Sequence, residues 1–166
     1  MLTSDQEYMN LALELGLQAR REGDIPVGAL VVLPCGEIIG RGRNRARILH
    51  DPTAHAEVVA LREAARNLGV WNLNGCSLYS TFEPCPMCAG ALVQARVSRL
   101  VYGVTNSKRG ACGTLYNLTN YTRLFHRLQV VPGVMEQECR ALLCDFYREC
   151  REVFNTFGRL LDGRNN

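Results

Sequence analysis

Two short stretches, His55-Ala56-Glu57 and Pro84-Cys85-Pro86-Met87-Cys88, decide how the fold and chemistry of this sequence are interpreted. Each stretch opens a segment with helical hydrophobic spacing, at about residues 54–67 and 85–94. A Cys-x-x-Cys pair in a first helical turn directs both sulfurs to one side, where the positive end of the helix dipole favours thiolates. The pattern therefore predicts that His55, Cys85 and Cys88 bind one Zn²⁺ ion.

Three protein ligands leave one tetrahedral position open, which is typical of a catalytic zinc site and not of a structural one. Glu57 lies two residues after His55, so its carboxylate is placed to exchange protons at that open position. Taken alone, a Cys-x-x-Cys pair is also typical of a redox pair, and a His-x-Glu of a helix surface. Their combination, separated by about thirty residues, is the signature of zinc nucleobase deaminases.

The pattern around these stretches predicts helices alternating with strands. We expect helices at 5–21, 54–67, 85–94 and 135–154, and strands at 27–33, 37–40, 77–81, 99–104 and 124–131. This order favours a single mixed sheet covered by helices, which is an α/β sandwich. We expect one deaminase domain over residues 1–157 and a frayed tail over residues 158–166.

The composition excludes several classes of protein. The chain has 166 residues, of which 47% are hydrophobic and 21% are charged, as in an average globular domain with one core. No apolar run approaches the roughly 18 residues that a membrane span needs, and no secretory signal pattern is present. Eight cysteines without such a signal are typical of free thiols and metal ligands. We therefore expect a cytoplasmic protein that does not bind membranes.

The net charge of +3 is unevenly distributed along the chain. Residues 1–83 carry −2 and residues 136–166 carry −1, whereas residues 84–135 carry +6 and contain no Asp or Glu. Two explanations stay open. An internal sheet with short loops needs few carboxylates, or a polyanion lies against this segment. The second explanation predicts that a nucleic-acid strand passes over residues 84–135.

Further motifs support a family resemblance that covers roughly residues 5–155. They are Ile25-Pro26-Val27-Gly28-Ala29, Asn44-Arg45, His50-Asp51-Pro52-Thr53-Ala54, Cys88-Ala89-Gly90-Ala91 and Lys108 to Gly113. Together with the two opening stretches, they resemble the bacterial tRNA adenosine deaminases of the cytidine deaminase-like superfamily. The resemblance implies a three-layer α/β/α sandwich with a five-stranded mixed sheet, a homodimer, and conversion of adenine to hypoxanthine in a tRNA anticodon loop.

The resemblance also implies roles for single residues. Glu57 is expected to move protons, Asn44 to bind the nucleoside, and the backbone N–H of Ala56 to hold the purine. Asp24, Ile25 and Val27 match positions that line the base pocket. The further residues expected to contact the substrate are Phe82, Asn106, Lys108, Arg109 and Tyr121.

One group of residues departs from the natural family pattern. Asn106 stands where natural members usually carry Asp, and around it lie Val104, Ser107, Arg109, Asn117, Asn120 and Tyr121. This set resembles the laboratory-evolved members of adenine base editors, which act on deoxyadenosine in single-stranded DNA and are fused to an RNA-guided nuclease. An Asp can accept a hydrogen bond from the 2′-hydroxyl, which DNA lacks, whereas Asn106 removes the charge beside the phosphates.

Four alternative functions stay open. The chain can be a natural tRNA anticodon deaminase with Asn at position 106. A guanine deaminase uses a similar pair of motifs, and a cytosine substrate needs only a different pocket. A non-catalytic nucleic-acid-binding module with a structural zinc is the fourth, and the three ligands with an intact Glu57 disfavour it.

Overall fold

The computed structural model describes residues 4–161, with side chains over residues 4–152. Helix α1 (Asp5–Arg21) begins at a capping box, in which Ser4 accepts a hydrogen bond from the Glu7 N–H and the Glu7 carboxylate accepts one from the Ser4 N–H. The other elements are β1 (Gly28–Val32), β2 (Ile38–Arg43), α2 (Ala46–Leu49), α3 (Ala56–Leu68), β3 (Ser77–Phe82), α4 (Pro86–Gln94), β4 (Arg99–Val104), the 3-10 helix η1 (Leu118–Asn120), β5 (Gln129–Pro132) and α5 (Glu136–Leu161).

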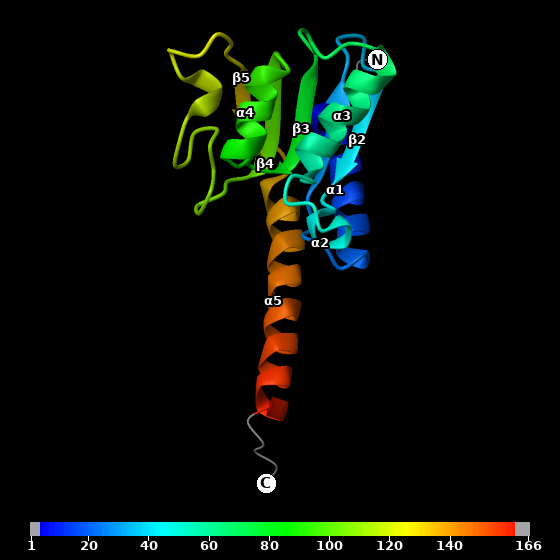
Figure 1. The fold of residues 1–166 in the computed structure, drawn as a ribbon, viewed down its shortest axis with the longest axis vertical. Coiled ribbons are helices and arrows are strands. Elements are labelled where there is room, and N and C mark those ends of the chain that lie inside the picture. The colour runs from blue at the N-terminus through cyan, green and yellow to red at the C-terminus, as the bar shows by residue number, and fades with distance from the viewer. Residues whose placement is uncertain (1–3, 162–166) are drawn as a thin grey trace.

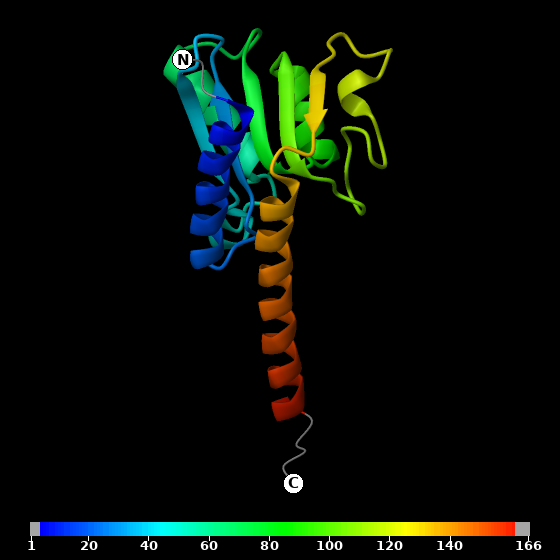
Figure 2. The same cartoon turned by 180° about the vertical axis from the view of Figure 1, so that it is seen from behind.

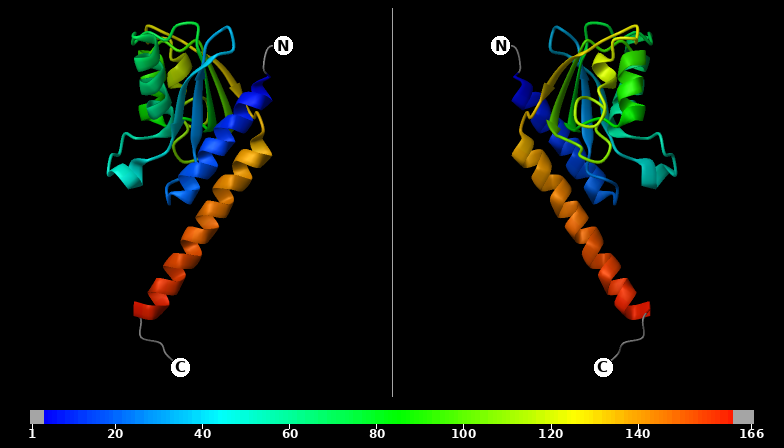
Figure 3. Two further views of the ribbon diagram at one scale, coloured as in Figure 1. Left: turned by 90° about the vertical axis from the view of Figure 1, so that its right-hand side faces the viewer. Right: turned by 90° about the vertical axis from the view of Figure 1, so that its left-hand side faces the viewer.

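The five strands form one mixed sheet in the order β2-β1-β3-β4-β5 (Figure 1). Strand β1 is antiparallel to β2 and β3, whereas β3, β4 and β5 run parallel. Helices α1 and α5 cover one face of the sheet, and α3 and α4 cover the other (Figure 3). The predicted α/β/α sandwich with a five-stranded mixed sheet is therefore confirmed.

Two glycines let helices approach the sheet closely. A Cβ at Gly28 would lie 1.9 Å from the carbonyl oxygen of Ala12, so α1 can rest on β1 only without one. A Cβ at Gly42 would lie 2.0 Å from the carbonyl oxygen of Ala56, at the start of α3. The absence of a side chain at Gly42 therefore lets the start of α3 lie directly against β2. This helix start carries His55 and Glu57.

The fifth strand is shorter than its hydrophobic pattern predicts. The prediction of a strand over 124–131 was wrong for residues 124–128, because β5 covers only Gln129–Pro132. The segment before β5 is instead held by the region around η1, since the N–H of Leu128 donates to the carbonyl of Thr119. The side chain of His126 also contacts the carbonyl of Val97, 2.7 Å from its Nε2 atom.

The closing helix is longer than the sequence predicts. Helix α5 continues to Leu161, so it includes residues 158–161 of the expected tail, while residues 162–166 lie outside the described residues. Its distal part extends away from the sheet, beyond the other elements (Figures 1 and 2). Over the described residues, no helix is both long and apolar enough to span a membrane.

Candidate active site

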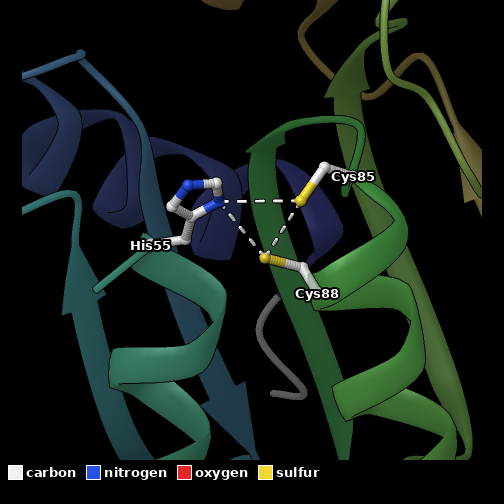
Figure 4. Close-up of side chains that lie close together, drawn as sticks. All are labelled: His55, Cys85 and Cys88. Carbon is white, nitrogen blue, oxygen red and sulfur yellow. Dashed lines mark hydrogen bonds between the residues drawn. The ribbon is translucent and has the colours of Figure 1, made fainter. Parts of the chain in front are cut away.

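His55, Cys85 and Cys88 come together as the sequence predicts (Figure 4). The Nδ1 atom of His55 lies 3.7 Å from the sulfur of Cys85 and 3.5 Å from that of Cys88, and the two sulfurs are 3.8 Å apart. Tetrahedral Zn²⁺ with ordinary bond lengths requires about 3.6 Å between nitrogen and sulfur and about 3.8 Å between sulfurs. The three ligand atoms therefore fit one face of a zinc tetrahedron, and the fourth position stays free of these ligands.

The ligands occupy the starts of two neighbouring helices. His55 is the N-cap of α3, and Cys85 is the N-cap of α4, both with extended backbone. The helices thus begin at Ala56 and Pro86, slightly later than the pattern of the sequence indicates. Pro86 suits the first helical position because the N–H that it lacks has no acceptor there. Both positive helix ends face the ligands, which favours thiolates and an anionic ligand set.

The sulfurs have different proton affinities in the absence of metal. The hydrogen bond from Cys88, helped by one from His55, lowers the pKa of Cys85 to about 4. The same bond to Cys85, together with burial, raises the pKa of Cys88. The hydrogen bond to Cys85 also raises the pKa of His55. Zinc binds cysteine as the thiolate, so binding of zinc at this site releases protons from the sulfurs.

Glu57 lies in the first turn of α3, beside the three ligands. Only 4% of its surface is exposed, yet it lines the pocket that opens over the metal site. Burial raises its pKa to about 7, against the opposing effects of its own backbone N–H and of the charge on His55. A carboxyl group with a pKa near neutrality can both accept and return a proton, as catalysis by a general acid and base requires.

The pocket above this site has a volume of about 820 Å³, which is in the range of small-molecule binding sites. Seven of the residues expected to contact the substrate line it: Ile25, Val27, Asn44, Phe82, Asn106, Lys108 and Arg109. Tyr121 does not line it and lies beyond η1, with 47% of its surface exposed. Ala56 is fully buried, and its N–H is the first of α3, where a helix supplies no acceptor.

Asp24 does not line the pocket but holds Asn44, which does. Its carboxylate accepts a hydrogen bond from Nδ2 of Asn44 at 2.7 Å and others from the backbone of Ile25, Arg47 and Ile48. Burial raises the pKa of Asp24, but these hydrogen bonds outweigh it and hold the pKa below its usual value. Since the amide nitrogen of Asn44 is held by Asp24, its amide oxygen remains to accept a hydrogen bond in the pocket.

Asn106 is a buried residue that lines the pocket, at the start of the loop that follows β4. Its Oδ1 atom accepts hydrogen bonds from the N–H groups of Lys108 and Arg109, at 3.2 and 3.0 Å. The side chain therefore closes a tight turn that presents the exposed side chains of Lys108 and Arg109 at the rim of the pocket.

The six basic residues of segment 84–135 have different surroundings. Arg99 forms an ion pair with Asp5, and the guanidinium of Arg96 lies over the rings of Trp71 and Phe125. Of the six, only Lys108 and Arg109 line the pocket. Two of the six positive charges therefore lie at the pocket, and the passage of a nucleic-acid strand over residues 84–135 stays a prediction.

The residues of α5 that line the pocket were not identified from the sequence. Residues spaced by three or four positions along one face of this helix line the pocket: Arg140, Leu143, Cys144, Tyr147 and Arg151. Their helical spacing was a usable signal, but the sequence alone does not show which face of α5 meets the pocket. Glu83 was also missed, although a charged residue directly after a buried strand is a signal of a polar role.

Known proteins resemble this chain in sequence and in structure. The family model of the cytidine and deoxycytidylate deaminase zinc-binding region matches residues 2–104. The tRNA-specific adenosine deaminase of Bacillus subtilis (strain 168) is 44% identical over 151 residues, which cover 91% of this chain and 93% of that protein.

Two solved structures extend the comparison. One, from a study of A-to-I editing by tRNA:A34 deaminases at the wobble position of transfer RNA, has a TM-score of 0.79 at 40% identity, and the match covers 82% of this chain and 98% of the other. The guanine deaminase from Nitrosomonas europaea has a TM-score of 0.76 at 25% identity, over 88% and 86% of the two chains.

Proposed function

Because this chain belongs to the family of zinc-dependent cytidine and deoxycytidylate deaminases, and within it to the tRNA-specific adenosine deaminases, we propose that it converts adenine to hypoxanthine in a single nucleic-acid strand. The observation that carries the proposal is the open-sided group of His55, Cys85 and Cys88 beside the buried carboxylate of Glu57. The floor of the pocket thus combines a metal site with a group that can carry protons.

The base is bound by the wall nearest the zinc ligands. Ile25, Val27, Phe82 and Val104 offer apolar surface to the faces of a purine. The amide oxygen of Asn44 accepts a hydrogen bond from the nucleoside, and the N–H of Ala56 donates one to the purine. These contacts require the target nucleotide to leave its stack, because the ligands lie at the bottom of the pocket.

Glu57 carries the protons of the reaction. Bound zinc supplies the Lewis acid that makes water nucleophilic near neutral pH. The carboxylate of Glu57 accepts a proton from the attacking water and returns it to N1 of adenine. It then passes the second water proton to the amino group at C6. The C6–N bond breaks, ammonia leaves, and the oxygen of water remains on C6.

Single-stranded DNA is the polymer that the loop after β4 favours. The Oδ1 atom of Asn106 accepts from the N–H groups of Lys108 and Arg109, and Asn106 lines the pocket, so we assign its Nδ2 group as a donor to the substrate. An Asp here keeps the same turn but places a bare carboxylate oxygen toward the sugar and its phosphates. Asn106 thus supports acceptance of a strand without a 2′-hydroxyl, while a tRNA anticodon loop remains the alternative substrate.

The proposed reaction is tested by incubating the zinc-loaded protein with a single-stranded DNA and a tRNA anticodon hairpin and then sequencing both. We expect adenine to be read as guanine in both, and Glu57→Ala to abolish the change. A change of cytosine to thymine would replace adenine by cytosine as the substrate. No change in either polymer, together with consumption of free guanine, would favour a guanine deaminase.

The preference for DNA is tested by Asn106→Asp. We expect activity on DNA to fall about tenfold, because one added negative charge faces the phosphates, while activity on the hairpin falls far less. The matched control is Asn117→Asp, which adds the same charge to the same loop at an exposed position outside the pocket. Equal losses of activity on both polymers, or equal effects of the two variants, would show that Asn106 does not distinguish deoxyribose from ribose.

The homodimer implied by the family also remains a proposal. Large apolar side chains at the end of α3 and beyond η1 are exposed, including Trp71 and Phe125, and they offer surface for a second copy. Sedimentation equilibrium of the zinc-loaded protein tests it, and a monomer at micromolar concentration would argue against it.

A further inference from the structure

Glu83 is a buried carboxylate for which the proposed reaction has no use. It follows the last residue of β3, and only 1% of its surface is exposed. Its Oε1 atom accepts hydrogen bonds from the N–H groups of Cys112 and Thr114, both at 3.1 Å. Its Oε2 atom accepts hydrogen bonds from the N–H of Asn106, at 2.9 Å, and from the hydroxyl of Thr114. Both oxygens are therefore fully used, which compensates for their loss of solvent.

All four donors belong to one segment, residues 105–117, which we call the rim loop. This loop connects β4 with η1 and carries Asn106, Lys108 and Arg109 at the edge of the pocket. The N–H of Ala111 adds a fifth bond, to the carbonyl of Pro84 at 3.0 Å. The rim loop is thus docked on the two residues that immediately precede the zinc ligand Cys85.

The close fit at Gly110 shows how tightly the rim loop rests on Glu83. A Cβ at Gly110 would lie 2.3 Å from the Oε2 atom of Glu83 and 2.6 Å from the carbonyl oxygen of Asn106. The N–H of Gly110 donates to that same carbonyl, at 2.8 Å. The loop can therefore lie this close to Glu83 only because position 110 has no side chain.

We propose that Glu83 is a positioning residue for the nucleic-acid substrate, because it fixes the rim loop at a set distance from the zinc ligands. It acts through the loop and does not touch the reacting atoms. The turn at Asn106 is anchored by its own N–H on Glu83, so the direction in which Lys108 and Arg109 leave the loop depends on this carboxylate. The inference rests on the proposed function, since the rim loop is assigned there to the polymer.

Glu83→Gln tests the proposal, because it keeps the shape of the side chain but replaces one accepting oxygen by an amide that cannot accept. We expect the KM for a single-stranded DNA substrate to rise about tenfold while kcat changes less than about threefold. The zinc content should stay the same, and amide exchange at Asn106, Cys112 and Thr114 should accelerate. Thr114→Val removes one donor without changing charge, so it should shift KM and exchange in the same direction by less.

Asp5→Asn is the matched control. Asp5 is also a carboxylate with several hydrogen bonds, from Arg99 and Tyr79, but it lies outside the pocket and the rim loop. We expect it to lower the thermal midpoint and leave KM unchanged. An unchanged KM in Glu83→Gln, or an equal rise in Asp5→Asn, would overturn the proposal. If Glu83→Gln does not fold, an unchanged KM in Thr114→Val overturns it.

The proposed function can fail independently of this inference. If the wild-type chain leaves the oligonucleotide unchanged, the reaction assigned above is wrong. The affinity of each variant for the same oligonucleotide, measured by fluorescence anisotropy, then decides the role of Glu83. Equal affinities of wild type and Glu83→Gln would overturn that role.

Discussion

Glu57 and Glu83 line the same pocket and are almost equally hidden from solvent, yet their surroundings prepare them for opposite tasks. Glu83 is held by four donors of the rim loop. For Glu57, burial dominates over the groups that favour its charge, and its pKa rises to about 7. The comparison teaches that two buried carboxylates of one pocket can have different tasks: Glu83 holds a loop through its hydrogen bonds, whereas burial prepares Glu57 to exchange a proton.

Removal of zinc with a chelator should give the largest effect and should separate the two carboxylates. Deamination is expected to disappear and to return on addition of Zn²⁺, because Glu57 then has no activated water to deprotonate. Amide exchange of the rim loop should stay slow, since its bonds to Glu83 involve no zinc ligand. Fast exchange at Cys112 and Thr114 in the metal-free protein would show that Glu83 holds the loop only together with the metal.

Glu57→Gln should reduce kcat by about 10³-fold, because the amide cannot accept the proton of water. The zinc content, the KM and the exchange of the rim loop should match those of the wild type. Metal analysis and steady-state kinetics on single-stranded DNA check this expectation. Residual turnover within tenfold of the wild type would assign the proton transfer to another group.

Asp24→Asn extends the comparison to a third buried carboxylate, which resembles Glu83 because its hydrogen bonds hold other groups. We expect kcat/KM to fall about tenfold, because the new amide opposes Nδ2 of Asn44 and turns that side chain in the pocket. The control is Glu22→Gln, which removes a charge two residues away, from a carboxylate paired with Arg43. Equal kinetics of the two variants would contradict the positioning of Asn44 by Asp24.

Tyr121→Ala should have the smallest effect, less than about threefold on kcat/KM. Tyr121 is exposed and lies outside both the pocket and the set of residues bonded to Glu83. Kinetics on a short and a long oligonucleotide test this. A loss of tenfold or more with the long one alone would show that a base beyond the pocket stacks on Tyr121.

Features with a local cause could be predicted from the sequence. The helix over 5–21 and the strand over 99–104 match α1 and β4, because caps and hydrophobic period determine their limits. The zinc ligands were also recognisable, since spacing alone brings Cys85 and Cys88 to one side of a helix start. The shorter β5 was not predictable, because the region around η1 competes for its first residues.

Roles that depend on distant backbone could not be predicted. Asp24 matched the lining of a base pocket, but its oxygens bind Asn44 and the backbone of residues 47 and 48. Asn106 shows a nearby partner that the sequence analysis also missed, because its Oδ1 atom closes a turn with the N–H groups of Lys108 and Arg109, while its role at the sugar stays a prediction. The hydrogen-bond donors to Glu83 are 23 to 31 positions away along the chain, and a hydrophobic pattern does not indicate such distant partners.

Because α5 supplies one wall of the pocket, this wall is synthesised after the metal site. The zinc ligands and the first four strands of the sheet all lie before residue 105, so they leave the ribosome early. Leu143, Tyr147 and Arg151, which line the pocket above them, are synthesised later. A chain that stops before α5 therefore contains every metal ligand but lacks one side of the enclosure for its substrate.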